Sequence, residues 1–235
     1  MFATSAKATL TVTGIENLTV PGDPVDVEIL GGVFGSDPFG FPVFPDIYTE
    51  GEGTAGATSA VSPELTLPDF DDPTILDIGD SLSIDLTTSG SAAAPGDFAG
   101  ALIGALGIVT IDNLSLTDDV AVSFLLDIML DVTASLDDPL TEDAVGGAGV
   151  DAYSFGGDLD LIEEVEADAL FGIFDPPFTS SLAFTLTIGA DDFYDIEIFV
   201  ETGGFAEVLP APGGMLMLLG GLVAIRWRRG RRGSV

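Results

Sequence analysis

Short runs in which apolar and polar residues alternate are the feature that most constrains the fold of this chain. The pattern is plainest in Thr9–Thr13, Val25–Ile29 and Leu82–Leu86. Alternation with a period of two puts one set of side chains in a core and the other in water, which is typical of a β-strand. Further runs of this kind are Ile108–Leu116, Val120–Leu136, Leu182–Ile188 and Tyr194–Val200. Gly, Pro and Asp separate them, so the sequence predicts an all-β fold, an antiparallel β-sandwich of immunoglobulin-like or jelly-roll type.

Three segments of the body do not alternate cleanly. Phe98–Gly107 is rich in Gly and Ala and fits either a short helix or a glycine-rich strand. Leu161–Leu170 has apolar residues four apart, which predicts a short helix that caps the sandwich. Gly31–Gly56 combines many glycines with prolines and aromatics, and it predicts a long ordered loop.

The charge of the chain excludes several classes of partner. There are 39 acidic and 6 basic residues, and the last acid is Glu207. Lys7 is the only basic residue before the C-terminal arginines. Binding of a nucleic-acid backbone needs Lys or Arg side chains, so we expect no nucleic-acid partner. The self-repulsion of the acids must be relieved by salt, by bound cations or by spreading the acids over the surface.

The absence of Cys and His restricts the chemistry further. Disulfides, thiolate metal sites and Ser–His or Cys–His catalytic pairs are excluded. A Ser–Lys pair could use only Lys7, which falls within the predicted remnant of a signal peptide. Paired carboxylates are therefore the remaining catalytic arrangement. We therefore predict that the chain is not an enzyme, with a carboxylate-based hydrolase as the less favoured alternative.

The C-terminal tail differs from the body in every respect. Val208–Ile225 is a run of 18 uncharged residues, which is near the shortest length that spans a bilayer as a helix. An arginine cluster follows it: Arg226, Arg228, Arg229, Arg231 and Arg232. By the positive-inside rule these arginines would stay in the cytoplasm and the acidic body would lie outside. The sequence thus predicts a separate C-terminal transmembrane helix.

This tail resembles the sorting signal of PEP-CTERM proteins, which are exported bacterial proteins, and in particular the variant with the motif Val-Pro-Leu-Pro-Ala. The matching residues are Val208, Leu209, Pro210, Ala211 and Pro212. The resemblance covers residues 208–235 only, and the first proline of the variant motif is missing. It implies that an exosortase-type membrane protease processes the chain near this motif. It also implies transient anchoring in the inner membrane, followed by delivery to the cell surface or the extracellular space.

The two ends suggest a division into three parts. Ala6-Lys7-Ala8 has the form of a signal-peptidase site, so residues 1–8 are predicted to be the remnant of a signal peptide whose apolar region lies upstream. Residues 9–207 would form the acidic β-sandwich domain, and residues 208–235 the sorting signal.

Calcium is the metal that suits an acidic chain without Cys or His, because Ca²⁺ prefers hard oxygen ligands. Gly146–Tyr153 matches one unit of the calcium-binding β-roll repeat, with Asp151 as the ligand. Asp71 and Asp72 lie in a second acidic run that could gather a cation in a loop. We otherwise predict no cofactor.

These observations lead to one functional hypothesis and one rival. The sorting tail and the missing catalytic machinery favour a structural or interaction protein of the envelope, biofilm or exopolysaccharide matrix. Its partners would be the processing protease, the inner membrane and components of the envelope or exopolysaccharide. The rival is a Ca²⁺-dependent adhesion or glycan-binding module.

Overall fold

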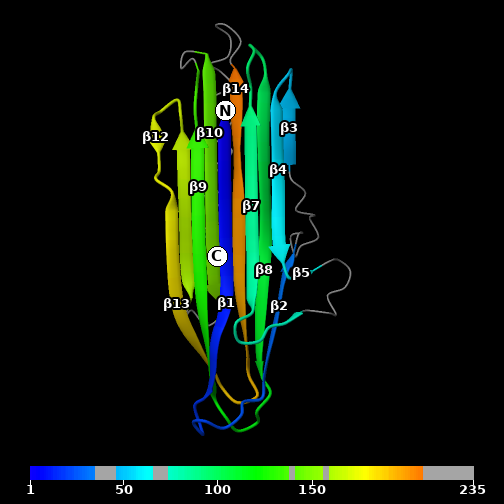
Figure 1. Cartoon of the computed structure of the whole chain (residues 1–235), viewed down its shortest axis with the longest axis vertical. Coiled ribbons are helices and arrows are strands. Elements are labelled where there is room, and N and C mark those ends of the chain that lie inside the picture. Colours follow the sequence, from blue (N-terminus) through cyan, green and yellow to red (C-terminus); the bar gives the residue numbers. More distant parts are fainter. Residues whose placement is uncertain (35–45, 66–73, 138–140, 156–158, 209–235) are drawn as a thin grey trace.

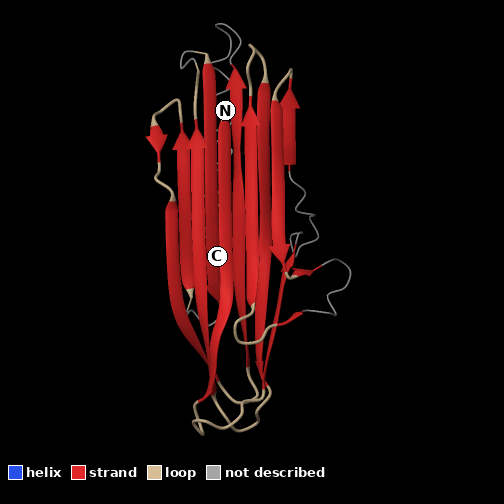
Figure 2. Ribbon diagram, in the orientation of Figure 1, coloured by secondary structure: helices blue, strands red, loops and turns tan. Residues whose placement is uncertain are grey.

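The structure, a computed structural model, describes residues 1–34, 46–65, 74–137, 141–155 and 159–208. Within these ranges the chain is all-β and contains no helix (Figure 2). The long strands run side by side along the long axis of the molecule (Figure 1). The strands are β1 (Phe2–Asn17), β2 (Val27–Phe34), β3 (Asp46–Glu50), β4 (Thr54–Ser62), β5 (Glu64–Leu65), β6 (Thr74–Ile75), β7 (Ser81–Ser91), β8 (Phe98–Asn113), β9 (Val120–Ala134), β10 (Glu142–Ser154), β11 (Asp160–Asp168), β12 (Ile173–Phe174), β13 (Phe178–Ile188) and β14 (Phe193–Val208).

The strands form two sheets. The five-stranded sheet has the order β13-β9-β1-β7-β4. The nine-stranded sheet has the order β12-β11-β10-β14-β8-β2-β5, with β3 paired to β8 and β6 paired to β2. The described pairs are antiparallel except for the two-residue pairing of β2 with β5. The predicted all-β, antiparallel character is therefore confirmed.

The hydrophobic core lies between the two sheets and is built by the alternation that the sequence shows. In β1 the even-numbered side chains from Phe2 to Val12 are buried, and the odd-numbered ones face solvent. Phe2 illustrates how closely the sheets approach. A Cβ at Gly90 would lie 2.4 Å from the Phe2 ring and one at Gly204 2.7 Å from it, so both positions exclude larger residues. These two glycines, one from each sheet, make room for the ring.

A hydroxyl cluster crosses the core between the sheets. Thr4 of β1 exchanges hydrogen bonds with Thr88 of β7, at 2.6 Å, and with Thr202 of β14. Thr202 also donates to the carbonyl oxygen of Gly147, at 3.3 Å. Because each buried hydroxyl has a partner, the cluster avoids the cost of an unpaired polar group. Its hydrogen bonds also link the two sheets at a defined position.

The two sheets repeat one arrangement. The neighbours β13-β9-β1-β7-β4 of one sheet correspond in order to β6-β2-β8-β14-β10 of the other. Asn17 and Asn113, at the ends of the corresponding strands β1 and β8, play the same role. The side-chain oxygen of Asn17 accepts a hydrogen bond from the Thr19 amide, and that of Asn113 accepts one from the Ser115 amide. The molecule therefore has an approximate internal twofold relation between its halves.

Two predictions about local structure were wrong. The segment Leu161–Leu170, predicted to be a helix, contains strand β11. A spacing of four residues is also a multiple of two, so Leu161 and Val165 fit an inward-facing strand row as well as a helix face. The long loop predicted for Gly31–Gly56 was also wrong, because β2 continues to Phe34 and β3 and β4 both begin before residue 56.

Two further segments are settled by the structure. Phe98–Gly107 is the first part of β8, whose small residues allow close packing on both faces, so the strand alternative is correct. β1 begins at Phe2, well before the predicted domain start at Thr9. Residues 2–8 belong to the central strand of the five-stranded sheet, and Ala6 and Ala8 are fully buried.

Candidate functional site

The outward face of the five-stranded sheet is lined mainly by hydroxyl groups, and we call it the hydroxyl face. Five charged side chains interrupt it: Lys7, Glu16, Asp85, Asp127 and Asp131. Its Ser and Thr residues are Ser5, Thr9, Thr11, Thr54, Thr58, Ser62, Ser81, Ser83, Thr87, Ser89, Ser91, Ser123, Thr133, Thr179, Ser181, Thr185 and Thr187.

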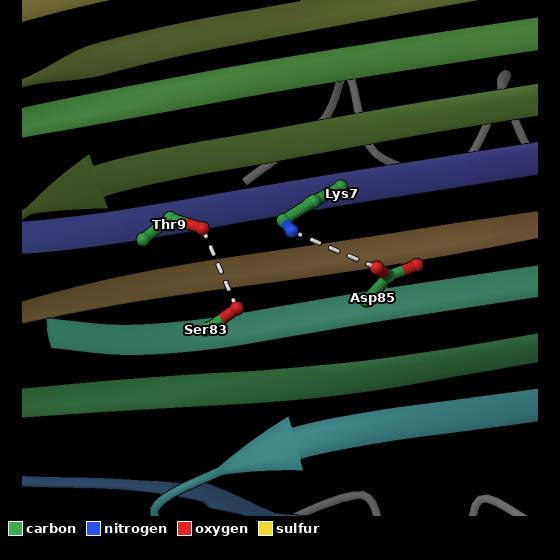
Figure 3. A network of polar contacts seen from close by, with 4 residues as sticks. All are labelled: Lys7, Thr9, Ser83 and Asp85. Carbon is green, nitrogen blue, oxygen red and sulfur yellow. Dashed lines mark hydrogen bonds and ion pairs between the residues drawn. The ribbon is translucent and has the colours of Figure 1, made fainter.

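Hydroxyls on this face pair across neighbouring strands. The hydroxyl oxygens of Thr58 and Thr87 lie 2.6 Å apart. Those of Thr9 and Ser83 lie 3.4 Å apart (Figure 3). Beside them, Lys7 Nζ lies 3.7 Å from Asp85 Oδ2 (Figure 3). Both charged side chains are more than two-fifths exposed, so this ion pair adds little stability. Its main effect is to cancel one of the few charges on the face.

The outward face of the nine-stranded sheet has the opposite character, and we call it the acidic face. Among the described residues it carries no Lys or Arg. Its acids are Glu28, Asp46, Glu50, Asp112, Asp143, Asp151, Asp160, Glu164, Glu166, Asp168, Asp195, Glu197, Glu201 and Glu207. The charge of the body is thus unevenly divided between its two broad faces.

Aromatic side chains lie among these acids. Phe98 and Phe205 stack with ring centroids 6.2 Å apart. Tyr153 contacts Phe155 edge-on, with centroids 6.1 Å apart, and donates its hydroxyl to Glu197. Burial and then the neighbouring Glu197 carboxylate raise the pKa of Tyr153 to about 12, so the hydroxyl stays protonated. The acidic face therefore combines carboxylates with apolar ring surfaces.

The most unusual group on the acidic face is the carboxylate of Asp143. The residue is only 3% exposed, and its Oδ1 atom is buried without a hydrogen-bond partner among the described residues. It lies directly across the strand pair from Glu207 and close to Asp168. Burial, followed by the charge of Asp168, raises the pKa of Asp143 to about 6. Burial also raises the pKa of Glu207, with Glu50 adding to the effect.

A second buried carboxylate, that of Asp97, has hydrogen-bond partners at both of its oxygens. Its oxygens accept backbone hydrogen bonds from Glu52 at 2.9 Å, Ala94 at 2.8 Å and Ala93 at 3.4 Å. These amides, with Glu52 contributing most, hold the pKa of Asp97 below its ordinary value. Asp97 thus joins the turn before β4 to the turn before β8 and has a structural role.

Of the sequence-predicted calcium ligands, only Asp151 lies among the described residues. Asp151 lies in the interior of β10, which pairs antiparallel with both β11 and β14. A β-roll site needs successive turns stacked in parallel, so the interpretation of Gly146–Tyr153 as such a unit was wrong. Asp71 and Asp72 lie outside the described residues. In the part of the chain that the structure describes, no three acidic side chains are arranged to hold a metal ion.

The predicted sorting motif is described only at its first residue. Val208 ends β14, is buried, and pairs with Glu142 of β10. Leu209, Pro210, Ala211 and Pro212 lie outside the described residues, as do Arg226, Arg228, Arg229, Arg231 and Arg232. Within the described ranges there is no helix long and apolar enough to cross a membrane.

One pair of carboxylates bears on the hydrolase alternative. Glu164 and Glu201 flank Gly149 on the acidic face, and their Cγ atoms lie 3.6 and 4.0 Å from where a Cβ of Gly149 would be. Glu164 is exposed on an open sheet. A catalytic acid needs a dry environment to stay protonated near neutral pH, and this position does not provide one.

The segregation of charge between the two faces was missed by the sequence interpretation. The signal is present in the polar positions of the alternating runs. Those positions are Thr in Thr9–Thr13 but acids in Tyr194–Val200. Sorting the strands by the residue type at their outward positions would have divided them between two sheets.

Comparisons with known proteins do not assign the chain to a family. No family model and no curated protein matches the chain. Among solved structures, a secreted serine protease, VesC from Vibrio cholerae, aligns over 87% of this chain and 46% of its own length. The identity is 8% and the TM-score 0.17, so this alignment carries no argument about fold or function.

Proposed function

We propose that this protein is an exported structural or interaction protein of the bacterial envelope or extracellular matrix, and that its acidic face binds a cationic, amine-bearing polysaccharide. The observation that carries this proposal is the division of charge between the two broad faces. Fourteen acids, without a described Lys or Arg, share the acidic face with the rings of Phe98, Phe199 and Phe205.

The chemistry of that face favours a polymer over a compact ligand. A strand of sixteen residues is roughly 50 Å long, so the carboxylates are spread along a surface that a chain of many sugar units could follow. Ammonium groups on the polymer would meet carboxylates, and sugar faces would contact exposed rings such as that of Tyr153. An anionic polymer would be repelled by the same surface.

The test compares two triple variants of the full chain, in non-ionic detergent, for binding to chitosan, a glucosamine polymer. One variant, Glu164→Gln/Glu166→Gln/Glu201→Gln, removes charge from the acidic face. The other, Asp85→Asn/Asp127→Asn/Asp131→Asn, removes the same charge from the hydroxyl face. At about 0.5 kcal/mol for each exposed charge, the first variant should bind roughly tenfold more weakly. The second should change affinity less than twofold.

Salt and polymer controls sharpen this test. Affinity should fall steeply between 50 and 300 mM salt, since exposed charges are screened over about 10 Å at 0.1 M. Fully N-acetylated polymer, which has lost its amines, should bind much more weakly than chitosan. Equal losses in the two triple variants would show that net charge alone matters and would refute the acidic face as the site.

Export and processing are proposed from the tail. The inferred pathway is cleavage by an exosortase-type protease near Pro210–Pro212, after the apolar segment that follows β14 has anchored transiently in the inner membrane as a helix. In a host that encodes such a protease, Pro210→Ala/Pro212→Ala should accumulate as full-length protein in the membrane fraction, whereas the parent chain should appear shortened at the surface or in the medium. Release of the variant at the parent's size would contradict the assignment of the motif.

We further infer that the two facing sheets form an antiparallel sandwich, with the immunoglobulin-like and jelly-roll topologies both retained as predictions. The internal twofold relation, which places matching strands in the two sheets, supports a sandwich.

A Ca²⁺-dependent adhesion or glycan-binding module is the second candidate, favoured by the buried Asp143 oxygen that has no described hydrogen-bond partner. The described acids form no three-carboxylate site, so Ca²⁺ near Asp143 would need further oxygen ligands from the backbone or water. At constant ionic strength Ca²⁺ should then raise the melting temperature of the parent chain but not of Asp143→Asn. An unchanged parent melting temperature would remove this candidate.

A further inference from the structure

The exposed edges of the two sheets are unequally protected. In the described part of the nine-stranded sheet the terminal strands β12 and β5 are two residues long. β12 is followed by Asp175 and two prolines. Short strands, charge and proline are the usual means by which an open edge avoids pairing with another chain.

Within its own length the β13 edge has none of these protections, although Asp175 and the two prolines stand directly before it. Its eleven residues, Phe178–Ile188, contain no charge, no proline and no glycine. They are rich in Phe, Thr, Leu and Ile, which favour β-structure and edge-to-edge pairing. β13 pairs with β9 on one side only. By the internal twofold relation, its counterpart in the other sheet is β6, which has only two residues.

The other edge of the five-stranded sheet, β4, is less suited to this role. It is also uncharged, but its nine residues include Gly56 and are mostly Ala, Ser and Thr with small side chains. The chain has 39 acids and six basic residues, so most of its surface repels a second copy. The long β13 edge is uncharged and rich in β-favouring residues, and two copies can pair most readily there.

We propose that β13 is a self-association edge, where β13 of a second copy pairs antiparallel around a twofold axis perpendicular to the sheet. The two five-stranded sheets then become one continuous ten-stranded sheet. Antiparallel pairing continues the pattern of every other pair in this sheet. A twofold of this orientation keeps both hydroxyl faces on one side and both acidic faces on the other.

The register follows from the length of the strand. Pairing all eleven residues requires residues 178 and 188 to lie opposite each other, and this puts Ala183 opposite its own copy. Ala183 is exposed and lies on the hydroxyl face, next to Leu125 of β9. Opposed residues of an antiparallel pair have Cα atoms about 4.5–5.5 Å apart, which lies within the range of a disulfide.

Charge repulsion does not oppose this contact strongly. The described acid nearest to the middle of β13 is Asp127, which lies one strand inward and accepts a hydrogen bond from Ser181. Across the interface two such carboxylates are separated by two further strands, so roughly 14 Å at the usual strand spacing. That distance exceeds the screening length of about 8 Å at physiological salt.

The absence of cysteine gives a direct test. Ala183→Cys introduces one thiol into the full chain, studied in non-ionic detergent at micromolar concentration. Oxidation should convert most of it to a covalent dimer on a non-reducing gel. Thr58→Cys, on the β4 edge, and Thr9→Cys, in the middle of the hydroxyl face, are matched controls. They should give at least tenfold less dimer.

A second variant measures association without a cross-link. Thr185→Lys places a cation at the edge and reduces the net negative charge, so weaker association cannot come from added overall repulsion. By light scattering, it should raise the dimer dissociation constant at least tenfold, whereas Thr58→Lys should leave it unchanged. A parent chain that is monomeric at 100 µM would overturn the proposal. Cross-linking that occurs only when Ala183→Cys and Thr58→Cys are both present would also overturn it. That result would show that β13 of one copy pairs with β4 of another.

Discussion

Replacing the buried carboxylate of Asp143 by an amide should stabilise the protein, and the size of the effect follows from its surroundings. The Asp143 side chain is 3% exposed, has one oxygen without a described partner, and faces the charges of Asp168 and Glu207. Its pKa is raised from 3.8 to about 6. A difference of about two pKa units corresponds to about 3 kcal/mol, which is an upper limit for the gain in Asp143→Asn at pH 8.

The pH dependence gives the prediction its sign. Between pH 3.8 and 6 the folded parent protein binds more protons than the unfolded chain, so its stability falls as pH rises through this window. Asn cannot titrate and does not share this loss. The advantage of Asp143→Asn should therefore be largest above pH 6. By the same linkage it should fall by about half between pH 8 and pH 5.

The assay is urea unfolding of the full chain followed by circular dichroism at pH 5, 6, 7 and 8. The isoelectric point near 4.1 sets the lower limit of that range. Asp131→Asn, an exposed carboxylate on the hydroxyl face, is the matched control and should change the free energy of unfolding by less than about 0.5 kcal/mol. A variant that is less stable than the parent at pH 8, or a gain that does not depend on pH, would refute the reasoning.

Two further predictions concern the contact between the sheets. Gly146→Val should destabilise the fold by about 1–3 kcal/mol in urea unfolding, because a Cβ there would lie 2.7 Å from Thr4 Cγ2. Gly56→Val, where no atom lies within 4 Å of the new Cβ, should be near neutral; equal effects would contradict the packing argument. Phe2→Ala should cost about 3–5 kcal/mol, since the ring is 1% exposed between the sheets. A loss below 1 kcal/mol would show that packing of the Phe2 ring between the sheets contributes little to stability.

The class of fold could be predicted from the sequence because alternation is a local property. Leu82–Leu86 predicts a half-buried strand wherever the strand lies in the molecule. The ends of the strands could not be predicted in this way. β1 begins at Phe2 because Phe2, Ala6 and Ala8 fill space left by the other sheet, and that space exists only after the sheets have packed.

The candidate site was harder to predict because it depends on which strands are neighbours. Asp143, Asp168 and Glu207 come from three strands, and no spacing in the sequence relates them. Asp151 shows the opposite error. Its local motif matched a calcium repeat, but the antiparallel pairing of β10 removes the stacked turns that the repeat requires. A motif is informative only when its neighbours in space have the arrangement that its chemistry needs.

The two proposals are connected by the way that charge is distributed over the two sheets. A chain with a formal charge of −33 resists association with copies of itself unless its acids are kept away from the contact. The described structure places fourteen acids on the outward face of one sheet and leaves β13, at the edge of the other, without charge. If two copies join through β13, the acids of both subunits face the same side and form one larger anionic surface. Self-association would then strengthen the binding of a long cationic polymer through multivalency, without any new contact between polymer and subunit. Chitosan should accordingly dissociate more slowly from the oxidised Ala183→Cys dimer than from the reduced chain diluted below the dimer dissociation constant.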